Sequence, residues 1–150
     1  MADFIGFELD ADDVRRALAG FPDIAQRHVS DVARRTANNI AAEAKRRLHR
    51  QLGPNATGRT EAGIGVYADE AANPLVFQII SARPELPGEQ GSKAAVPRFI
   101  ESGTKKGKKG SHDYPARPFL HVSAELEQAA FIRAIGEALN DAADESGLGD

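Results

Sequence analysis

Glycines and lysines fill residues 103–111, Gly-Thr-Lys-Lys-Gly-Lys-Lys-Gly-Ser, and such a segment could hold a phosphate group. The spacing of a phosphate-binding loop is not met, because the fifth residue after Gly103 is Lys108 rather than glycine and no buried strand precedes the segment. The lysines could still neutralise DNA phosphates without reading the base sequence. No aromatic residue lies between them to stack on bases, so we favour a solvated loop over a DNA-facing one. The lysines concerned are Lys105, Lys106, Lys108 and Lys109.

The histidines and serines show no spacing typical of a metal site or a catalytic triad. No two histidines form a His-x-His or His-x-x-x-His pattern, and the chain has no cysteine. The serines lack the Gly-x-Ser-x-Gly pattern of a hydrolase nucleophile. Glu101 ends a predicted short helix, and we expect it to pair with Arg98 or Arg117. The sequence therefore predicts no enzyme, no cofactor and no metal site.

Residues 96–120 carry the most distinctive pattern of the chain, which we call the clamp. Pro115 and Pro118 fix φ and remove backbone donors, so this part should be extended. Phe119 and Leu120 directly precede a helical pattern and should anchor that helix to the core. Gly103 stands where a short helix must stop, as a residue able to adopt positive φ would. The residues assigned to the clamp are Phe99, Ile100, Gly103, Thr104, Pro115, Arg117, Pro118, Phe119 and Leu120.

The clamp resembles part of the gene-product-ten-like neck proteins, or minor tail proteins, of long-tailed bacteriophages. Members carry a Glu-x-Gly-Thr element, a loop and a Pro-x-x-Pro-Phe-Leu element, preceded by a long basic helix and a Thr-Gly-Arg turn. This chain has all these pieces in the same order, with FIESGT at 99–104, YPARPFL at 114–120 and Thr-Gly-Arg at 57–59. The resemblance covers residues 10–145. It departs at residues 60–62, Thr-Glu-Ala, where the family has a leucine and a serine.

The resemblance implies a structural virion protein at the head–tail junction, active in head–tail joining or tail completion and assembled in the cytoplasm of the bacterial host. Copies would form a ring, a hexamer or a dodecamer, between the head-completion (stopper) proteins and the tail terminator. Transient, non-specific contact with packaged DNA is part of this expectation.

Two alternatives stay open. One is a tail-terminator protein or morphogenesis factor of the same junction. The other is a small DNA-binding module that uses the basic helix and the lysine loop.

Composition indicates one domain with a substantial core. The 150 residues include no cysteine, which fits assembly in a reducing compartment. No apolar run approaches the ~20 residues of a membrane span, and the N-terminus is acidic rather than a signal peptide, so we expect no membrane partner. We assign residues 1–21 to an N-terminal segment with a short helix, 22–145 to a single domain and 146–150 to a flexible acidic tail.

Charge is unevenly distributed along the chain. Residues 1–13 hold five acids and no base, residues 14–52 hold nine bases and three acids, and residues 121–150 hold one base and seven acids. This segregation suggests that the basic helix meets an acidic surface, in its own chain or in a neighbouring copy. Two solvated helix faces are the simpler alternative. The expected polar residues of a subunit interface are Arg34, Arg35, Arg46 and Arg50.

The periodicity predicts an α+β domain, with a long helix and a C-terminal helix packed on a small, mainly antiparallel sheet. The long basic helix should run from about Asp23 to Leu52, where no Pro or Gly interrupts it. A turn at 55–59 and strands near 64–68 and 75–80 follow, and residues 4–9 suggest an edge strand or a tail docked on a partner. A short helix at 96–101 precedes the lysine loop. The C-terminal helix, from 121 to about 143, should bury Val122, Leu126, Ala129, Ile132 or Phe131, Ile135 and Leu139.

Overall fold

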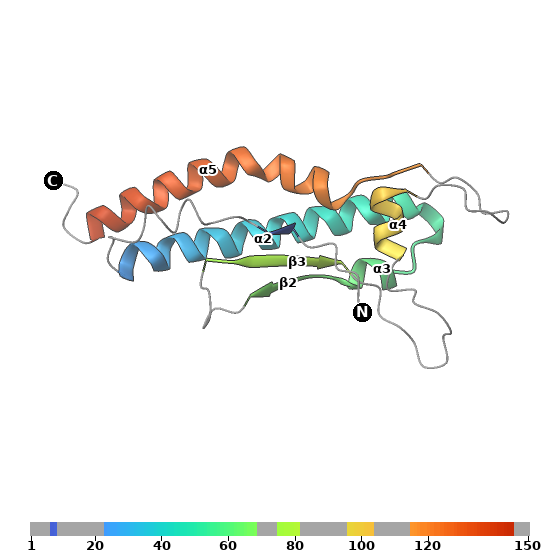
Figure 1. Cartoon of the computed structure of the whole chain (residues 1–150), viewed down its shortest axis with the longest axis horizontal. Coiled ribbons are helices and arrows are strands. Elements are labelled where there is room, and N and C mark those ends of the chain that lie inside the picture. Colours follow the sequence, from blue (N-terminus) through green and yellow to red (C-terminus); the bar gives the residue numbers. More distant parts are fainter. Residues whose placement is uncertain (1–6, 9–22, 69–74, 82–95, 104–114, 146–150) are drawn as a thin grey trace.

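The computed structural model describes residues 7–8, 23–68, 75–81, 96–103 and 115–145. Within these ranges two long helices pack on each other and on a small antiparallel sheet, which confirms the predicted α+β class (Figure 1). The short helix predicted within the N-terminal segment 1–21, the lysine loop and the acidic tail lie outside the described residues. The elements are β1 (Phe7–Glu8), α2 (Asp23–Leu52), η1 (Gly53–Asn55), α3 (Arg59–Ala62), β2 (Ile64–Ala68), β3 (Phe77–Ser81), α4 (Val96–Ser102) and α5 (Leu120–Glu145).

Helix α2 has the bounds that the sequence predicts. Its 30 residues correspond to a rod of about 45 Å at 1.5 Å per residue. Pro54 lies in the 3-10 turn η1, directly after the helix, where it cannot continue the α-helical hydrogen bonds. The buried face of α2 is rich in alanine, which lets neighbouring elements approach its backbone closely. These alanines are Ala25, Ala33, Ala37, Ala41 and Ala44.

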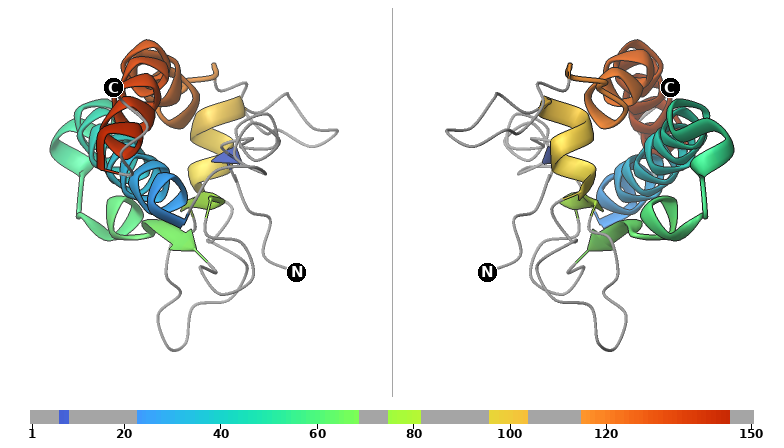
Figure 2. Two further views of the ribbon diagram at one scale, coloured as in Figure 1. Left: turned by 90° about the vertical axis from the view of Figure 1, so that its left-hand side faces the viewer. Right: turned by 90° about the vertical axis from the view of Figure 1, so that its right-hand side faces the viewer.

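Helix α5 runs antiparallel to α2, which lies between α5 and the strands β2 and β3 in Figure 1. Viewed along the long axis, α4 and β1 lie together on one side of the α2–α5 pair (Figure 2). No helix in the described ranges is long and apolar enough to cross a membrane.

The sheet has the strand order β1–β3–β2, and both pairings are antiparallel. Phe77, Ile79 and Ser81 are buried whereas Gln78 is exposed, so β3 shows the alternation of a strand with one face on the core. The predicted edge strand is confirmed at β1, and β2 has the predicted bounds. Strand β3 begins at Phe77, two residues later than predicted. The short helical segments η1 and α3 lie on either side of the turn predicted at residues 55–59 and include its first and last residues.

The predicted buried face of α5 is partly wrong. Leu126 and Ile132 are 59% and 63% exposed, and Ala129 is also exposed. Small residues pack inward instead, because the alanine-rich side of α5 fits closely against α2. The residues of α5 that are fully buried are Leu120, Ser123, Ala124, Ala138 and Ala142, and Phe131, Ile135 and Leu139 are partly buried.

Candidate functional site

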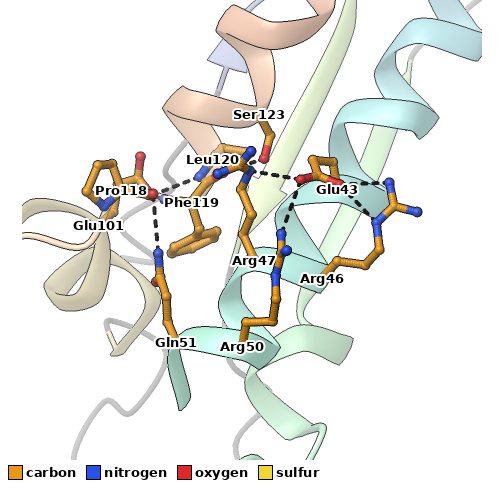
Figure 3. Close-up of polar contacts among 10 residues, drawn as sticks. All are labelled: Glu43, Arg46, Arg47, Arg50, Gln51, Glu101, Pro118, Phe119, Leu120 and Ser123. Carbon is orange, nitrogen blue, oxygen red and sulfur yellow. Dashed lines mark hydrogen bonds and ion pairs between the residues drawn. The ribbon is translucent and has the colours of Figure 1, made fainter. Parts of the chain in front are cut away.

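Glu101, near the end of α4, caps the start of α5 (Figure 3). Its Oε2 accepts hydrogen bonds from the backbone N–H groups of Phe119 and Leu120, at 2.7 and 2.9 Å, and its Oε1 accepts one from that of His121 at 2.9 Å. The first N–H groups of a helix have no acceptor inside the helix, and a carboxylate is favoured beside the positive end of the helix dipole. One side chain from another helix therefore satisfies three backbone donors.

The expectation that Glu101 pairs with Arg117 is wrong, whereas the alternative pairing with Arg98 stays a prediction. The carboxylate points to the backbone of α5, Arg117 is exposed, and the side chain of Arg98 lies outside the described residues. The physical reason lies at the start of α5, where Phe119 occupies the residue before the helix and has no side-chain oxygen to act as a cap. A distant carboxylate supplies what the local sequence lacks.

Further hydrogen bonds join the two motif elements to each other and to α2. The backbone N–H of Arg117 donates to the carbonyl oxygen of Ile100 at 2.8 Å. The amide nitrogen of Gln51, at the end of α2, donates to the carbonyl oxygen of Pro118 at 3.4 Å (Figure 3). Gly103 has φ of +71° directly after α4, as its position predicts. The FIESGT and PARPFL elements therefore form one joint at the C-terminal end of α2.

Two apolar side chains anchor this joint in the core. Phe119 is completely buried and Leu120 almost so, as the clamp predicts, and Ile100 packs partly buried against the same cluster. Pro115 and Pro118 are exposed. Ser123 donates its hydroxyl to the carbonyl oxygen of Phe119, one turn earlier. The other clamp residues lie outside what the structure describes, namely Thr104 and the side chain of Phe99, as do Lys105, Lys106, Lys108 and Lys109.

Glu43 forms ion pairs with three arginines in the C-terminal half of α2. Its carboxylate lies 2.8 Å from Nη2 of Arg46, 3.0 Å from Nε of Arg47 and 3.5 Å from Nη2 of Arg50 (Figure 3). The hydrogen bond from Arg46, together with the charges of all three guanidinium groups, outweighs partial burial and lowers the pKa of Glu43. Sequence reasoning named two of these arginines but missed Glu43, although its spacing of three, four and seven residues from them is typical of one helix face.

The arginines predicted for an interface do not form one patch. Arg46 and Arg50 lie together beside Glu43, and Arg35 lines a separate groove nearer to the start of α2. Arg34 is exposed on the same half of α2 as Arg35.

A basic pocket lies beside the C-terminal half of α2. Its lining includes Glu61 of α3, which is only 7% exposed. Oε1 of Glu61 lies 2.8 Å from Nδ1 of His49, whereas Oε2 is buried and has no hydrogen-bond partner within the described ranges. A buried acceptor without a donor is costly, so this carboxylate is incompletely satisfied. The full lining is Glu43, Lys45, Arg46, His49, Arg50, Gly58 and Glu61.

An acidic groove of about 420 Å³ lies between residues 28–39 of α2 and residues 127–141 of α5. Alanines from α5 make up part of its lining, and carboxylates from both helices lie along it. It holds four carboxylates against one guanidinium group. The lining residues are His28, Asp31, Val32, Arg35, Thr36, Asn39, Glu127, Ala130, Phe131, Ala134, Glu137, Ala138 and Asp141.

Glu145 joins the two helices at the far end from the clamp. Its carboxylate lies 2.6 Å from Nε2 of His28 and 3.1 Å from Nη2 of Arg27. The hydrogen bond with His28, with the charge of Arg27, lowers the pKa of Glu145. The acidic C-terminal helix thus meets the basic helix within the chain at this point.

The described residues contain no group of three or more His, Cys, Asp or Glu side chains that could hold a metal ion. The described residues form the joint of α4, α5 and the end of α2, and two surfaces of opposite charge, the acidic groove and the basic pocket. Comparisons with protein-family models, with curated proteins and with solved structures find no match to this chain.

Proposed function

We propose that the protein is a structural component of a bacteriophage neck, which joins head-completion proteins to the tail and assembles as a ring at the head–tail junction. The observation that carries the proposal is the bonding of Glu101 to the start of α5. It links the two motif elements on which the resemblance to the neck proteins rests. The residues of both motif elements make structural contacts, and their role at this joint requires no reactive group. Such a use of the motifs suits an assembly protein.

The shape and the charges of the helix pair lend further support. Helix α2 is longer than a compact domain of this size requires, and an overlong helix can present part of its surface to a neighbouring subunit. Leu126 and Ile132 are large apolar side chains that remain exposed on α5. The central part of a subunit interface is more apolar than the rest of the surface, and these two side chains are available to it.

The competing function is binding of duplex DNA by the basic surface. Lys45, Arg46 and Arg50 are exposed at the C-terminal half of α2, and they would release counterions on binding phosphates. The chain as a whole carries a net charge of −3, and α5 presents many carboxylates, which would repel DNA.

Light scattering on the purified full chain tests the two functions directly. The mass is measured over a range of protein concentrations at about 0.1 M and about 0.5 M salt, with and without duplex DNA. Closed particles that appear as rings in electron micrographs and ignore DNA would support the neck function. A monomer that binds DNA with a steep salt dependence would replace it with the DNA-binding function.

A further inference from the structure

The two charged surfaces of this chain lie at different places along α2. The acidic groove involves α2 from His28 to Asn39, and the basic pocket involves α2 from Glu43 to Arg50. Asp31 in the groove and Lys45 in the pocket are separated by fourteen helical positions, or about 21 Å along a rigid helix. The groove and the pocket of one molecule therefore cannot meet each other.

The groove has the chemistry of a surface that receives cations. Asp31 lies on the α2 side, and Glu127, Glu137 and Asp141 lie on the α5 side. Ala130 and Ala134 between them are small, so an approaching side chain can come close to the backbone of α5.

The pocket has the opposite charge and is incomplete by itself. Lys45, Arg46 and Arg50 bring three cations against the two carboxylates of Glu43 and Glu61, so the pocket has a small excess of positive charge. At the same place Oε2 of Glu61 is buried without a donor in the described part of the chain.

We propose that the acidic groove of one copy binds the basic pocket of a second copy. This inference deepens the proposed neck function by naming the contact between subunits. The contact itself does not depend on that function, whereas the closure of the copies into a ring rests on it. A second copy is the occupant because both complementary surfaces belong to the same chain. Groove against groove, or pocket against pocket, would bring like charges together and is disfavoured. A reciprocal pairing would stop at a dimer, and a head-to-tail pairing that closes would give a ring.

Charge exchange between Glu137 and Lys45 tests this contact. Both side chains are exposed, one in the groove and one in the pocket, so reversal should leave the fold intact. We expect Glu137→Lys alone and Lys45→Glu alone each to weaken self-association about tenfold, measured by sedimentation at low salt. The two variants mixed in equal amounts should associate again, and so should the chain that carries both substitutions. The matched control is Glu125→Lys, on α5 outside the groove, which should associate as the wild type does.

The other possible results contradict the groove–pocket contact, the ring or the neck function. Oligomers that both single variants leave unchanged would overturn the groove–pocket contact while leaving the ring possible. A wild type that stops at a dimer, weakened by either variant and restored by their mixture, would support the contact and count against the ring. A wild type that stays monomeric at every concentration would overturn the contact, and DNA binding by that monomer would overturn the neck function as well.

Discussion

Oε2 of Glu101 accepts the backbone N–H of Phe119 at 2.7 Å, across eighteen positions of sequence. The two residues belong to different motif elements. Glu101 places its carboxylate at the start of α5, and Phe119 is completely buried. The bond therefore fixes both the direction in which α5 leaves the joint and the position of its apolar anchor. Stability and assembly geometry should both depend on this pair.

Replacing Glu101 with alanine should destabilise the fold by about 1–3 kcal/mol, because α5 loses the acceptor for three backbone N–H groups. The free energy of unfolding, from urea denaturation followed by circular dichroism, measures the loss. Glu101→Gln keeps one oxygen as an acceptor and should fall between alanine and wild type.

The control for Glu101 is Glu125→Ala, at a glutamate within α5, the helix that Glu101 caps. Glu125 is exposed and contacts only His121 among the described residues, at 3.0 Å, so its loss should change the free energy of unfolding by less than about 0.5 kcal/mol. Equal effects of the two alanine substitutions would contradict the capping role of Glu101.

Phe119→Ala should lower the free energy of unfolding by about 3–5 kcal/mol, because a completely buried aromatic side chain leaves a cavity beside the core of α2 and β3. Leu126→Ala is the comparison, since Leu126 is also a large apolar residue near the start of α5 but is mostly exposed. Its effect should stay within about 0.5 kcal/mol. A loss below about 1 kcal/mol for Phe119→Ala would rule out its role as the anchor of the joint.

Gly58→Ala should destabilise the fold by about 1–2 kcal/mol through backbone strain alone. Gly58 has φ of +76° before α3, and a Cβ placed there would meet no atom within 4 Å, so crowding plays no part. Gly65→Ala in β2 is the matched control, because that position also has open space but no positive φ. Thermal unfolding of the two variants should show a loss only at Gly58, and a loss at both would point to a cause other than the turn.

The parts of the fold that the sequence predicts well depend on signals between neighbouring residues. Helix α2 starts and ends as expected because its interior has neither Pro nor Gly and because Pro54 follows it closely. The alternation of Phe77 and Ile79 with Gln78 similarly indicates a strand with one buried face. Gly103 and Phe119 have the conformation and the burial expected of them for the same reason.

The parts that sequence reasoning missed depend on contacts between distant residues. Glu101 finds its partners eighteen to twenty positions later, and nothing near it in sequence identifies them. The predicted buried face of α5 is partly wrong because it was chosen by its large apolar side chains. The small residues Ala138 and Ala142 instead pack closely against α2, and Ile132 stays exposed. The acidic groove combines residues of two helices that are about a hundred positions apart, so only their antiparallel packing reveals it.

The contribution of Glu43 to stability should depend on pH. Its pKa in the folded state is lowered below the ordinary 4.5 by the hydrogen bond from Arg46 and the charges of Arg47 and Arg50. A carboxyl group whose folded-state pKa is lowered stabilises the fold fully above its unfolded-state pKa, and this contribution is lost as the pH falls through the folded-state value. Glu43→Gln should therefore be less stable than the wild type near neutral pH, and the two should converge as the pH falls through the lowered pKa of Glu43.

Urea denaturation of both proteins at several pH values measures this convergence, because the difference between their free energies of unfolding isolates Glu43 from the other titrating groups. Glu125→Gln is a suitable control, since Glu125 is an exposed residue of α5 outside the groove and away from the three arginines. A difference between wild type and Glu43→Gln that stays constant with pH would mean that the carboxylate acts through packing rather than through its charge. In that case Arg46 and Arg50 would be freer to face a partner than the ion pairs with Glu43 imply.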